Sequence, residues 1–263
     1  MKFHDTVAIV TGGARGFGRA FAEEILAKRG KVLISDVNVH ELQATGKELQ
    51  CKFGESNVCW ERQNVTEKNS FSHAFACART YFKKPVNVLV NNAGIAGDMT
   101  FYEPDSTTWE SVVEIDLVAL IRGTKCAITE FKRTLNGKEG VIVNVSSMAG
   151  LMTVPFGPVY AAAKAGVVGF TRSLYSLKKS DNIRCFCMCP GFAETKMGRE
   201  ANAEVPEYIN MMGGLMPVKV VVDAFSAGLR DPGNSGRVQR IMKKNTLYYR
   251  FPGDKVLFPD SKL

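Results

Sequence analysis

Long hydrophobic runs are absent from this 263-residue chain. No stretch reaches the length of about 18 apolar residues that a transmembrane helix needs, so no transmembrane segment is expected. The first residues, MKFHDTVAIVTGG, lack the apolar core of a secretory signal peptide. We therefore expect a cytoplasmic protein.

Histidine is also scarce, with three residues in the chain, and the seven cysteines form no C-x-x-C pair. Cys185, Cys187 and Cys189 alternate in IRCFCMCPG, a pattern that places all three on one side of a strand. Neighbours at this spacing are poor disulfide partners. The cysteines are interpreted as small buried thiols in a reducing compartment, and no metal site is expected.

Positive charge exceeds negative charge, giving a formal net charge of +8, and part of it lies near the end in RVQRIMKKNTLYYR. Such a segment could favour an anionic substrate, a lipid surface or nucleic acid. No nucleic-acid-binding motif accompanies it. We expect a solvated outer face and no nucleic-acid partner.

Short apolar, β-branched runs alternate with longer helical patterns along most of the chain. This alternation predicts βαβ units, and hence one α/β domain with a doubly wound, seven-stranded parallel sheet covered by helices on both faces. The domain is assigned to residues 1–245 and a C-terminal tail to 246–263. Strands are predicted at 6–12, 31–36, 57–65, 86–94, 140–147, 183–191 and 237–242, and helices at 18–28, 40–52, 67–82, 107–133, 158–178 and 218–229.

A glycine-rich segment, TGGARGFG at residues 11–18, follows the first predicted strand. Gly12, Gly16 and Gly18 allow a tight turn in which backbone amides approach a pyrophosphate at a helix N-terminus. Asp36 ends the second strand, where an acidic side chain accepts hydrogen bonds from the adenosine ribose of NAD and repels the extra phosphate of NADP. Arg15 argues the other way, since a basic side chain in this loop could meet that phosphate.

A tyrosine and a lysine lie one helical turn apart in VYAAAKAG, at Tyr160 and Lys164. The spacing puts both side chains on one face of a helix, and the alanines between them leave the space above that face open. The pair could act on a molecule docked there, or it could be an ordinary core tyrosine beside a surface lysine.

Taken together, these segments resemble the short-chain dehydrogenase/reductase family. The chain carries the glycine segment, NNAG (91–94), NVSS (144–147), Tyr160-Ala-Ala-Ala-Lys164 and PGFAET (190–195) in the family's order, over residues 6–238. Within the family it is most similar to the NAD-dependent 15-hydroxyprostaglandin dehydrogenase branch. The resemblance implies a Rossmann fold and a homodimer or homotetramer paired through the helices at 107–133 and 158–178.

The resemblance also implies a set of site residues. Tyr160 takes the proton of a substrate hydroxyl while hydride passes to the nicotinamide, Lys164 holds the nicotinamide ribose and lowers the tyrosine pKa, and Ser147 hydrogen-bonds the reacting oxygen. Substrate contacts are expected at Ser147, Gly157, Tyr160 and Phe192. NAD contacts are expected at Gly12, Arg15, Gly16, Phe17, Gly18, Asp36, Asn64, Val65, Asn91, Ala93, Gly94, Tyr160, Lys164, Pro190, Gly191 and Thr195.

The chain departs from the family pattern at three positions. Asn64 stands where an aspartate usually meets adenine, and Gly157 stands where the prostaglandin enzyme has a substrate-contacting glutamine. Asp116 replaces an asparagine that shapes a helix kink and supports a proton-conducting water chain. An ionised Asp116 at about 8 Å would oppose phenolate formation by roughly 2 kcal/mol, whereas a protonated or backbone-bonded one would simply preserve the kink.

The methionine-rich segment within residues 192–217 is interpreted as a lid over an apolar substrate. The leading hypothesis is an NAD-dependent enzyme that interconverts a secondary alcohol and a ketone on a lipid-, prostaglandin- or steroid-like substrate. Two alternatives stay open: an NADP-linked carbonyl reductase, and a dinucleotide-binding sensor or scaffold without turnover.

Overall fold

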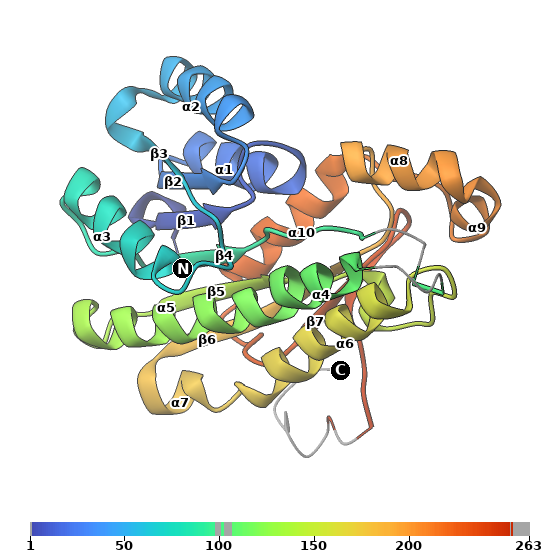
Figure 1. Ribbon diagram of the computed structural model, residues 1–263. Helices are drawn as coiled ribbons and strands as arrows, with labels where there is room; N and C mark the ends of the chain where they lie inside the picture. The colour runs from blue at the N-terminus through green and yellow to red at the C-terminus, as the bar shows by residue number, and fades with distance from the viewer. Residues whose placement is uncertain (1, 98–100, 103–106, 253, 255–263) are drawn as a thin grey trace.

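A central eight-stranded sheet organises the computed structural model, which describes residues 2–97, 101–102, 107–252 and 254. The strand order is β3-β2-β1-β4-β5-β6-β7-β8 (Figure 1). The strands are β1 Val7–Thr11, β2 Lys31–Asp36, β3 Val58–Arg62, β4 Val88–Asn91, β5 Gly140–Val145, β6 Ile183–Pro190, β7 Val238–Ile241 and β8 Thr246–Tyr248. The strand order reverses direction between β1 and β4. This position is the topological switch point, at which ligands of such sheets bind.

Helices cover both faces of the sheet, which is why the central strands read as nearly continuous apolar runs. Every residue of β1, β4, β5 and β6 is buried. One face carries α1 (Gly16–Ala27), α2 (Val39–Phe53) and α10 (Val218–Arg230). The other face carries α3 (Ser70–Phe82), α5 (Leu120–Thr134) and α6 (Pro158–Ser173).

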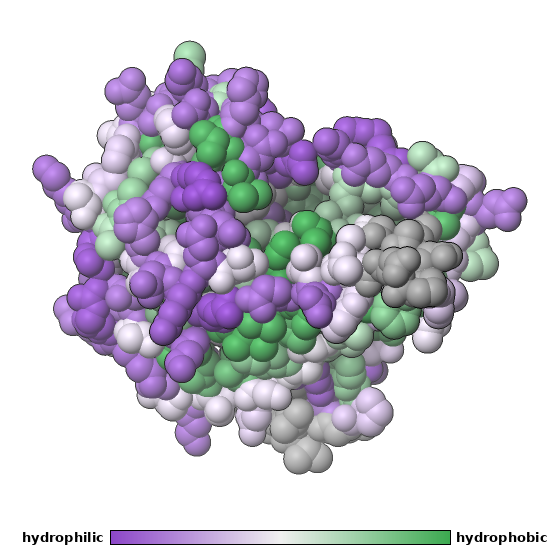
Figure 2. All heavy atoms as spheres, in the orientation of Figure 1, coloured by the Kyte–Doolittle hydropathy of each residue, from purple (hydrophilic) through white to green (hydrophobic). Residues whose placement is uncertain are grey.

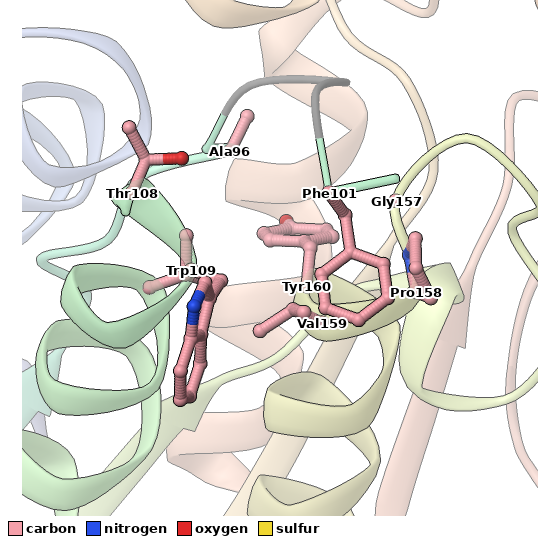
Figure 3. A pocket seen from close by; sticks show the side chains of 9 residues that line it. Ala96, Phe101, Thr108, Trp109, Gly157, Pro158, Val159 and Tyr160 are labelled. Carbon is pink, nitrogen blue, oxygen red and sulfur yellow. The ribbon is translucent and has the colours of Figure 1, made fainter. Parts of the chain in front are cut away.

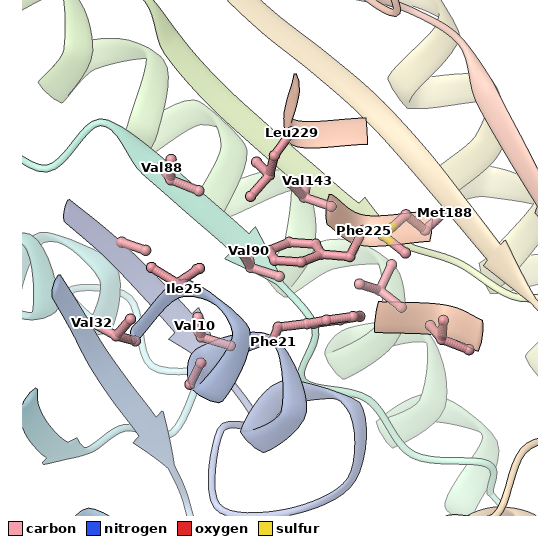
Figure 4. Close-up of a cluster of buried hydrophobic side chains, with 14 of the residues drawn as sticks. Val10, Phe21, Ile25, Val32, Val88, Val90, Val143, Met188, Phe225 and Leu229 are labelled. Atoms are coloured by element: carbon pink, nitrogen blue, oxygen red, sulfur yellow. The ribbon is translucent and has the colours of Figure 1, made fainter. Parts of the chain in front are cut away.

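The hydrophobic core beneath α1 and α10 contacts strands on both sides of the switch point between β1 and β4. Phe21 of α1 stacks on Phe225 of α10 with ring centres 4.4 Å apart, and both rings lie over valines of β1 and β4 (Figure 4). This packing fixes the start of α1, and with it the glycine segment, against the sheet.

The sequence predicted seven strands, and the structure has eight. The additional strand, β8, pairs antiparallel with β7, with Ile241 opposite Thr246. It comprises three residues, two of them exposed, at the edge of the sheet, so it lacks the apolar run that identifies a central strand. β8 begins where the predicted tail begins; residues 253 and 255–263 of that tail lie outside the described residues.

Two predicted helices are each divided. The stretch predicted at 107–133 consists of α4 (Thr108–Val113), a π-helical segment (Glu114–Ala119) and α5. The stretch predicted at 158–178 ends as α6 at Ser173, and α7 (Leu177–Asp181) begins after a tight turn. A hydrophobic pattern does not distinguish a π turn from the α-helix around it, because both bury the same face.

Cys185, Cys187 and Cys189 are fully buried on β6, and the Sγ atoms of the last two lie 3.9 Å apart. Within the part of the chain that the structure describes, no three His, Cys, Asp or Glu side chains cluster as metal ligands would. In the same described residues, no helix has the length and apolar character needed to cross a membrane.

Candidate active site

The glycine segment forms a tight turn between β1 and α1. Gly12 and Gly16 have φ angles of +62° and +56°, a conformation that favours glycine. A Cβ atom on Gly18 would lie 2.2 Å from the carbonyl oxygen of Gly12. The turn therefore leaves room for the backbone of α1 to face a phosphate at its N-terminus, as pyrophosphate binding requires.

Side chains from two neighbouring elements hold this turn. Asp36, at the end of β2, accepts hydrogen bonds from the backbone N–H groups of Ala14 (3.2 Å) and Asn38 (3.0 Å). Thr45 of α2 donates its hydroxyl to the carbonyl oxygen of Ala14 at 2.7 Å. The carboxylate predicted to meet the adenosine ribose is thus fixed beside the glycine turn.

The NNAG segment contributes a residue that the sequence analysis missed. Asn92 donates its side-chain amide to the carbonyl oxygens of Thr11 (2.9 Å) and Gly12 (3.1 Å), joining the end of β4 to the glycine turn. The second asparagine of the NNAG motif was the sequence feature that could have indicated this contact. The side chain of Asn91 turns inward and donates to Thr124 and Asn144, and the predicted cofactor contact of this residue stays a prediction.

Three further predicted cofactor residues have structural contacts of their own. Phe17 packs on the core and stacks on Phe21 with ring centres 6.1 Å apart. Val65 is buried among the residues beneath α3. The Oδ1 atom of Asn64 accepts hydrogen bonds from both the N–H and the hydroxyl of Thr66, so recognition of an adenine amino group by this atom would compete with that turn.

The segment after β6 faces the glycine turn from the opposite side. Gly191, which follows Pro190, donates its N–H to the carbonyl of Ile241 (2.9 Å), and Thr195 caps α8 (Lys196–Glu204) by accepting from the N–H of Gly198 (3.1 Å). A Cβ atom on Gly16 would lie 3.7 Å from the Thr195 methyl group. Figure 2 shows the surface hollowed between α1–α2 and α8, where these segments meet.

A buried ion pair lies at the centre of the site. Asp116, in the π-helical segment, places Oδ2 2.9 Å from Nζ of Lys164 and accepts the backbone N–H of Ile95 through Oδ1 at 2.8 Å. The two side chains are 0% and 6% exposed. A Cβ atom on Gly94 would lie 3.2–3.4 Å from the Asp116 oxygens and Lys164 Nζ, so the glycine of NNAG makes room for the pair.

Burial and pairing act in opposite directions on these two groups. Burial alone would lower the pKa of Lys164, but the Asp116 carboxylate and the Tyr160 phenol raise it above its ordinary value. Burial raises the pKa of Asp116, while Lys164 and the Ile95 N–H oppose that rise. The Asp116 carboxylate therefore favours the charged form of Lys164 and partly offsets that charge.

Tyr160 lies beside this pair, with Nζ of Lys164 5.4 Å from its ring centre. Burial raises the pKa of Tyr160; Lys164 lowers it, Asp116 raises it, and a hydrogen bond with Ser147 lowers it, leaving the pKa above its ordinary value. The Ser147 hydroxyl also accepts the N–H of Ala149 at 3.1 Å. The structure thus brings Ser147, Tyr160, Lys164 and Asp116 into one site.

Apolar side chains surround the outer face of Tyr160. Figure 3 shows the rings of Phe101 and of Trp109, from α4, beside Tyr160 at the start of α6. The space that they enclose with Ala96, Thr108, Val112, Gly157, Pro158 and Val159 is about 10 Å³, room for no more than one water. A larger molecule that approaches Tyr160 from this side must displace one of these side chains.

The predicted lid lies against the segment that precedes α6. Tyr208 of α9 (Pro206–Met211) packs edge-on to Phe156 and Phe192, with ring centres 5.0 Å and 6.3 Å away. Its hydroxyl donates to the carbonyl oxygen of Thr153 at 3.2 Å. Phe192, predicted to contact substrate, thereby packs against α9 of the same segment.

Comparison with known proteins supports the resemblance seen in the motifs. A family model described as short chain dehydrogenase matches residues 6–206. The enzymes named 15-hydroxyprostaglandin dehydrogenase [NAD(+)] of Bos taurus and Mus musculus are 29% and 34% identical, with 95% of this chain and 96% and 94% of theirs covered. A short chain dehydrogenase/reductase from Burkholderia phymatum, crystallised with NAD, superposes with TM-score 0.76 at 25% identity over 87% of both chains.

The chain belongs to the short-chain dehydrogenase family. It is an oxidoreductase of this family, and the predicted α/β Rossmann fold is confirmed apart from the eighth strand.

Proposed function

We propose that this protein is an NAD-dependent oxidoreductase that interconverts a secondary alcohol and a ketone on an apolar substrate. The observation that carries the proposal is the convergence of Ser147, Tyr160 and Lys164 between the glycine turn and an apolar wall. The names of the prostaglandin dehydrogenase relatives support both the cofactor and the substrate class.

In the proposed reaction, NAD held by the glycine turn would supply the acceptor for the hydride of the substrate carbon. The Tyr160 oxygen takes the hydroxyl proton, so alcohol and oxidised nicotinamide become ketone, reduced nicotinamide and a proton. Lys164 stabilises the phenolate through its charge, and Ser147 holds the reacting oxygen by a hydrogen bond. The Phe101 and Trp109 rings exclude water from the face at which the substrate carbon would lie.

The glycine turn fits the pyrophosphate of a dinucleotide, and Asp36 fits a ribose hydroxyl. Gly12, Gly16 and Gly18 would hold the phosphates through backbone N–H groups, and Asp36 would accept the adenosine ribose hydroxyls. A phosphate on that ribose would face the Asp36 carboxylate, which favours NAD over NADP. An NADP-linked carbonyl reductase is the second candidate, supported by Arg15 at the entrance of the same turn.

The test follows reduced nicotinamide by absorbance with NAD or NADP and a panel of secondary alcohols that includes hydroxylated fatty acids and steroids. The matched control is Tyr160→Phe, which keeps the ring and removes the acid–base group. We expect turnover with NAD that the control abolishes. Cofactor binding without turnover across the panel would instead favour the sensor or scaffold.

A homodimer or homotetramer is proposed on the resemblance, and so is a cytoplasmic location. Figure 2 shows apolar residues gathered over α5 and α6, the helices expected to pair. Light scattering of the purified protein distinguishes monomer, dimer and tetramer.

A further inference from the structure

The guanidinium of Arg15 is already engaged by a carboxylate. Nη1 of Arg15 lies 3.2 Å and 3.1 Å from the two carboxylate oxygens of Glu41, in the first turn of α2. Both side chains are partly exposed, at 53% and 38%. Arg15 immediately precedes Gly16, so the pair spans the entrance of the glycine turn beside Asp36.

The local structure of α2 explains why Glu41 is available for this contact. Asn38 caps the helix by accepting the N–H of Glu41 at 3.1 Å, and in a full capping box the glutamate would bond back to the Asn38 N–H. Asp36 takes that N–H instead, at 3.0 Å. The Glu41 carboxylate is therefore left free to turn toward the glycine segment.

The glycine segment is also held in reach of Glu41. Thr45, one helical turn after Glu41 on the same face of α2, donates to the carbonyl oxygen of Ala14 at 2.7 Å, and Asp36 accepts the Ala14 N–H. Both contacts are to the residue just before Arg15. These contacts fix the backbone next to Arg15, and the fixed backbone places the Arg15 side chain within reach of Glu41.

We propose that Glu41 is a specificity-determining residue that restrains Arg15 and thereby disfavours NADP. The inference rests on the proposed function, because it concerns the cofactor that the glycine turn would hold. A phosphate on the ribose would be repelled by the carboxylate of Asp36. To pair with Arg15, it would also have to displace the carboxylate of Glu41. Removing the Glu41 charge leaves Arg15 free to pair with that phosphate, as arginine does in many phosphate sites.

The experiment measures the dissociation constants of NADH and NADPH by the fluorescence of the reduced nicotinamide, without any substrate. Glu41→Gln is compared with wild type, Arg15→Gln and the Arg15→Gln/Glu41→Gln double variant. Glu48→Gln is the matched control, because Glu48 lies two turns further along α2 and pairs with a different arginine, Arg19, at 2.6 Å. Exposed pairs contribute little to stability, so all four variants are expected to fold.

We expect Glu41→Gln to shift the NADPH-to-NADH affinity ratio about fivefold toward NADPH, the size of one exposed ion pair, and Glu48→Gln to leave it unchanged. The shift should disappear when Arg15 is also replaced. An unchanged ratio in Glu41→Gln, or a shift that persists in the double variant, would overturn the role of Glu41. Failure of the wild type to bind either cofactor would overturn the proposed function itself.

Discussion

Replacing Asp116 by asparagine should make this enzyme active at lower pH. The Asp116–Lys164 contact of 2.9 Å and the 5.4 Å from Lys164 to the Tyr160 ring bound the carboxylate-to-ring separation at about 8 Å. At an effective dielectric of about 20, one charge at that distance opposes phenolate formation by about 2 kcal/mol, or about 30-fold. Asparagine keeps the side-chain length and removes the charge.

The sign follows from the groups around the phenol. Asp116 raises the pKa of Tyr160 and Lys164 lowers it, so removing the carboxylate leaves the cation unopposed. Oxidation of an alcohol needs the deprotonated phenol, and its rate therefore rises with pH up to the kinetic pKa. Below that pKa, Asp116→Asn should be up to about 30-fold faster than wild type, with little difference at high pH.

The assay is the pH dependence of kcat/KM for alcohol oxidation in wild type and Asp116→Asn. Asp116→Glu serves as the control that keeps the charge, and thermal unfolding of each variant checks that the ion pair's loss has not disrupted the fold. Superimposable pH profiles for wild type and Asp116→Asn, with both proteins folded, would refute the electrostatic reasoning and leave Asp116 as a support for the helix kink.

Three further predictions concern the surroundings of the site and the stability of the fold. Glu139 pairs with buried Arg184 at 3.3 Å, and burial raises its pKa while its cationic partners lower it overall. Glu139→Gln should therefore destabilise the protein by about 2 kcal/mol near pH 7. The difference in denaturant unfolding should shrink in acid and vanish once the pH falls below the lowered pKa of Glu139. Gly94→Ala should weaken NADH binding at least tenfold by displacing the buried ion pair, and unaltered binding would show that the pair can shift at little cost. A Cβ on Gly157 would find ordinary contacts of 3.7–3.8 Å, so Gly157→Ala should fold normally and reduce kcat/KM for bulky alcohols by narrowing the space beside Tyr160. Equal effects on small and bulky alcohols would contradict this.

Most of the sheet could be predicted because buried parallel strands have a strong sequence signature. The runs VAIVT and GVIVNV are apolar along their whole length, as strands covered on both faces must be. β8 had no such signature, because it is three residues long and lies at the sheet edge. Its position depends on the turn after β7, which a local pattern does not specify.

The site was predictable to the extent that it is built from strand ends. In a parallel sheet the carboxyl ends of β1, β4, β5 and β6 meet at one edge, so motifs far apart in sequence come together there. The directions of individual side chains were harder to predict from the sequence than the positions of the motifs. Asn91 ends β4 and Asn92 follows it, and although the two are chemically identical, the side chain of Asn91 faces the interior while that of Asn92 holds the glycine turn.

The Asp116–Lys164 and Arg15–Glu41 contacts could not be predicted from the sequence, for a geometric reason. Asp116 meets Lys164 directly rather than acting from a distance, and that contact depends on a π-helical segment that looks like ordinary α-helix in a hydrophobic pattern. Glu41 looked like a normal first-turn residue of a capped helix, and its partner lies 26 positions earlier. Each contact joins two elements whose relative placement comes from the packed fold.

These contacts give the site a common electrostatic character. In the proposed function Lys164 would meet the nicotinamide end of the dinucleotide and Arg15 the adenosine end, and each of these cations is paired with a carboxylate of the same chain. The pair at Lys164 is buried, so solvent screens the effect of its carboxylate on the neighbouring phenol only weakly, whereas the pair at Arg15 is exposed and weakened by solvent. Removing Asp116 should therefore change the pH dependence of the chemistry and leave the cofactor preference alone, while removing Glu41 should change the preference and leave the pH dependence alone. Measuring both properties in both variants separates the two carboxylates, since a shared change would mean that one general effect of charge underlies both.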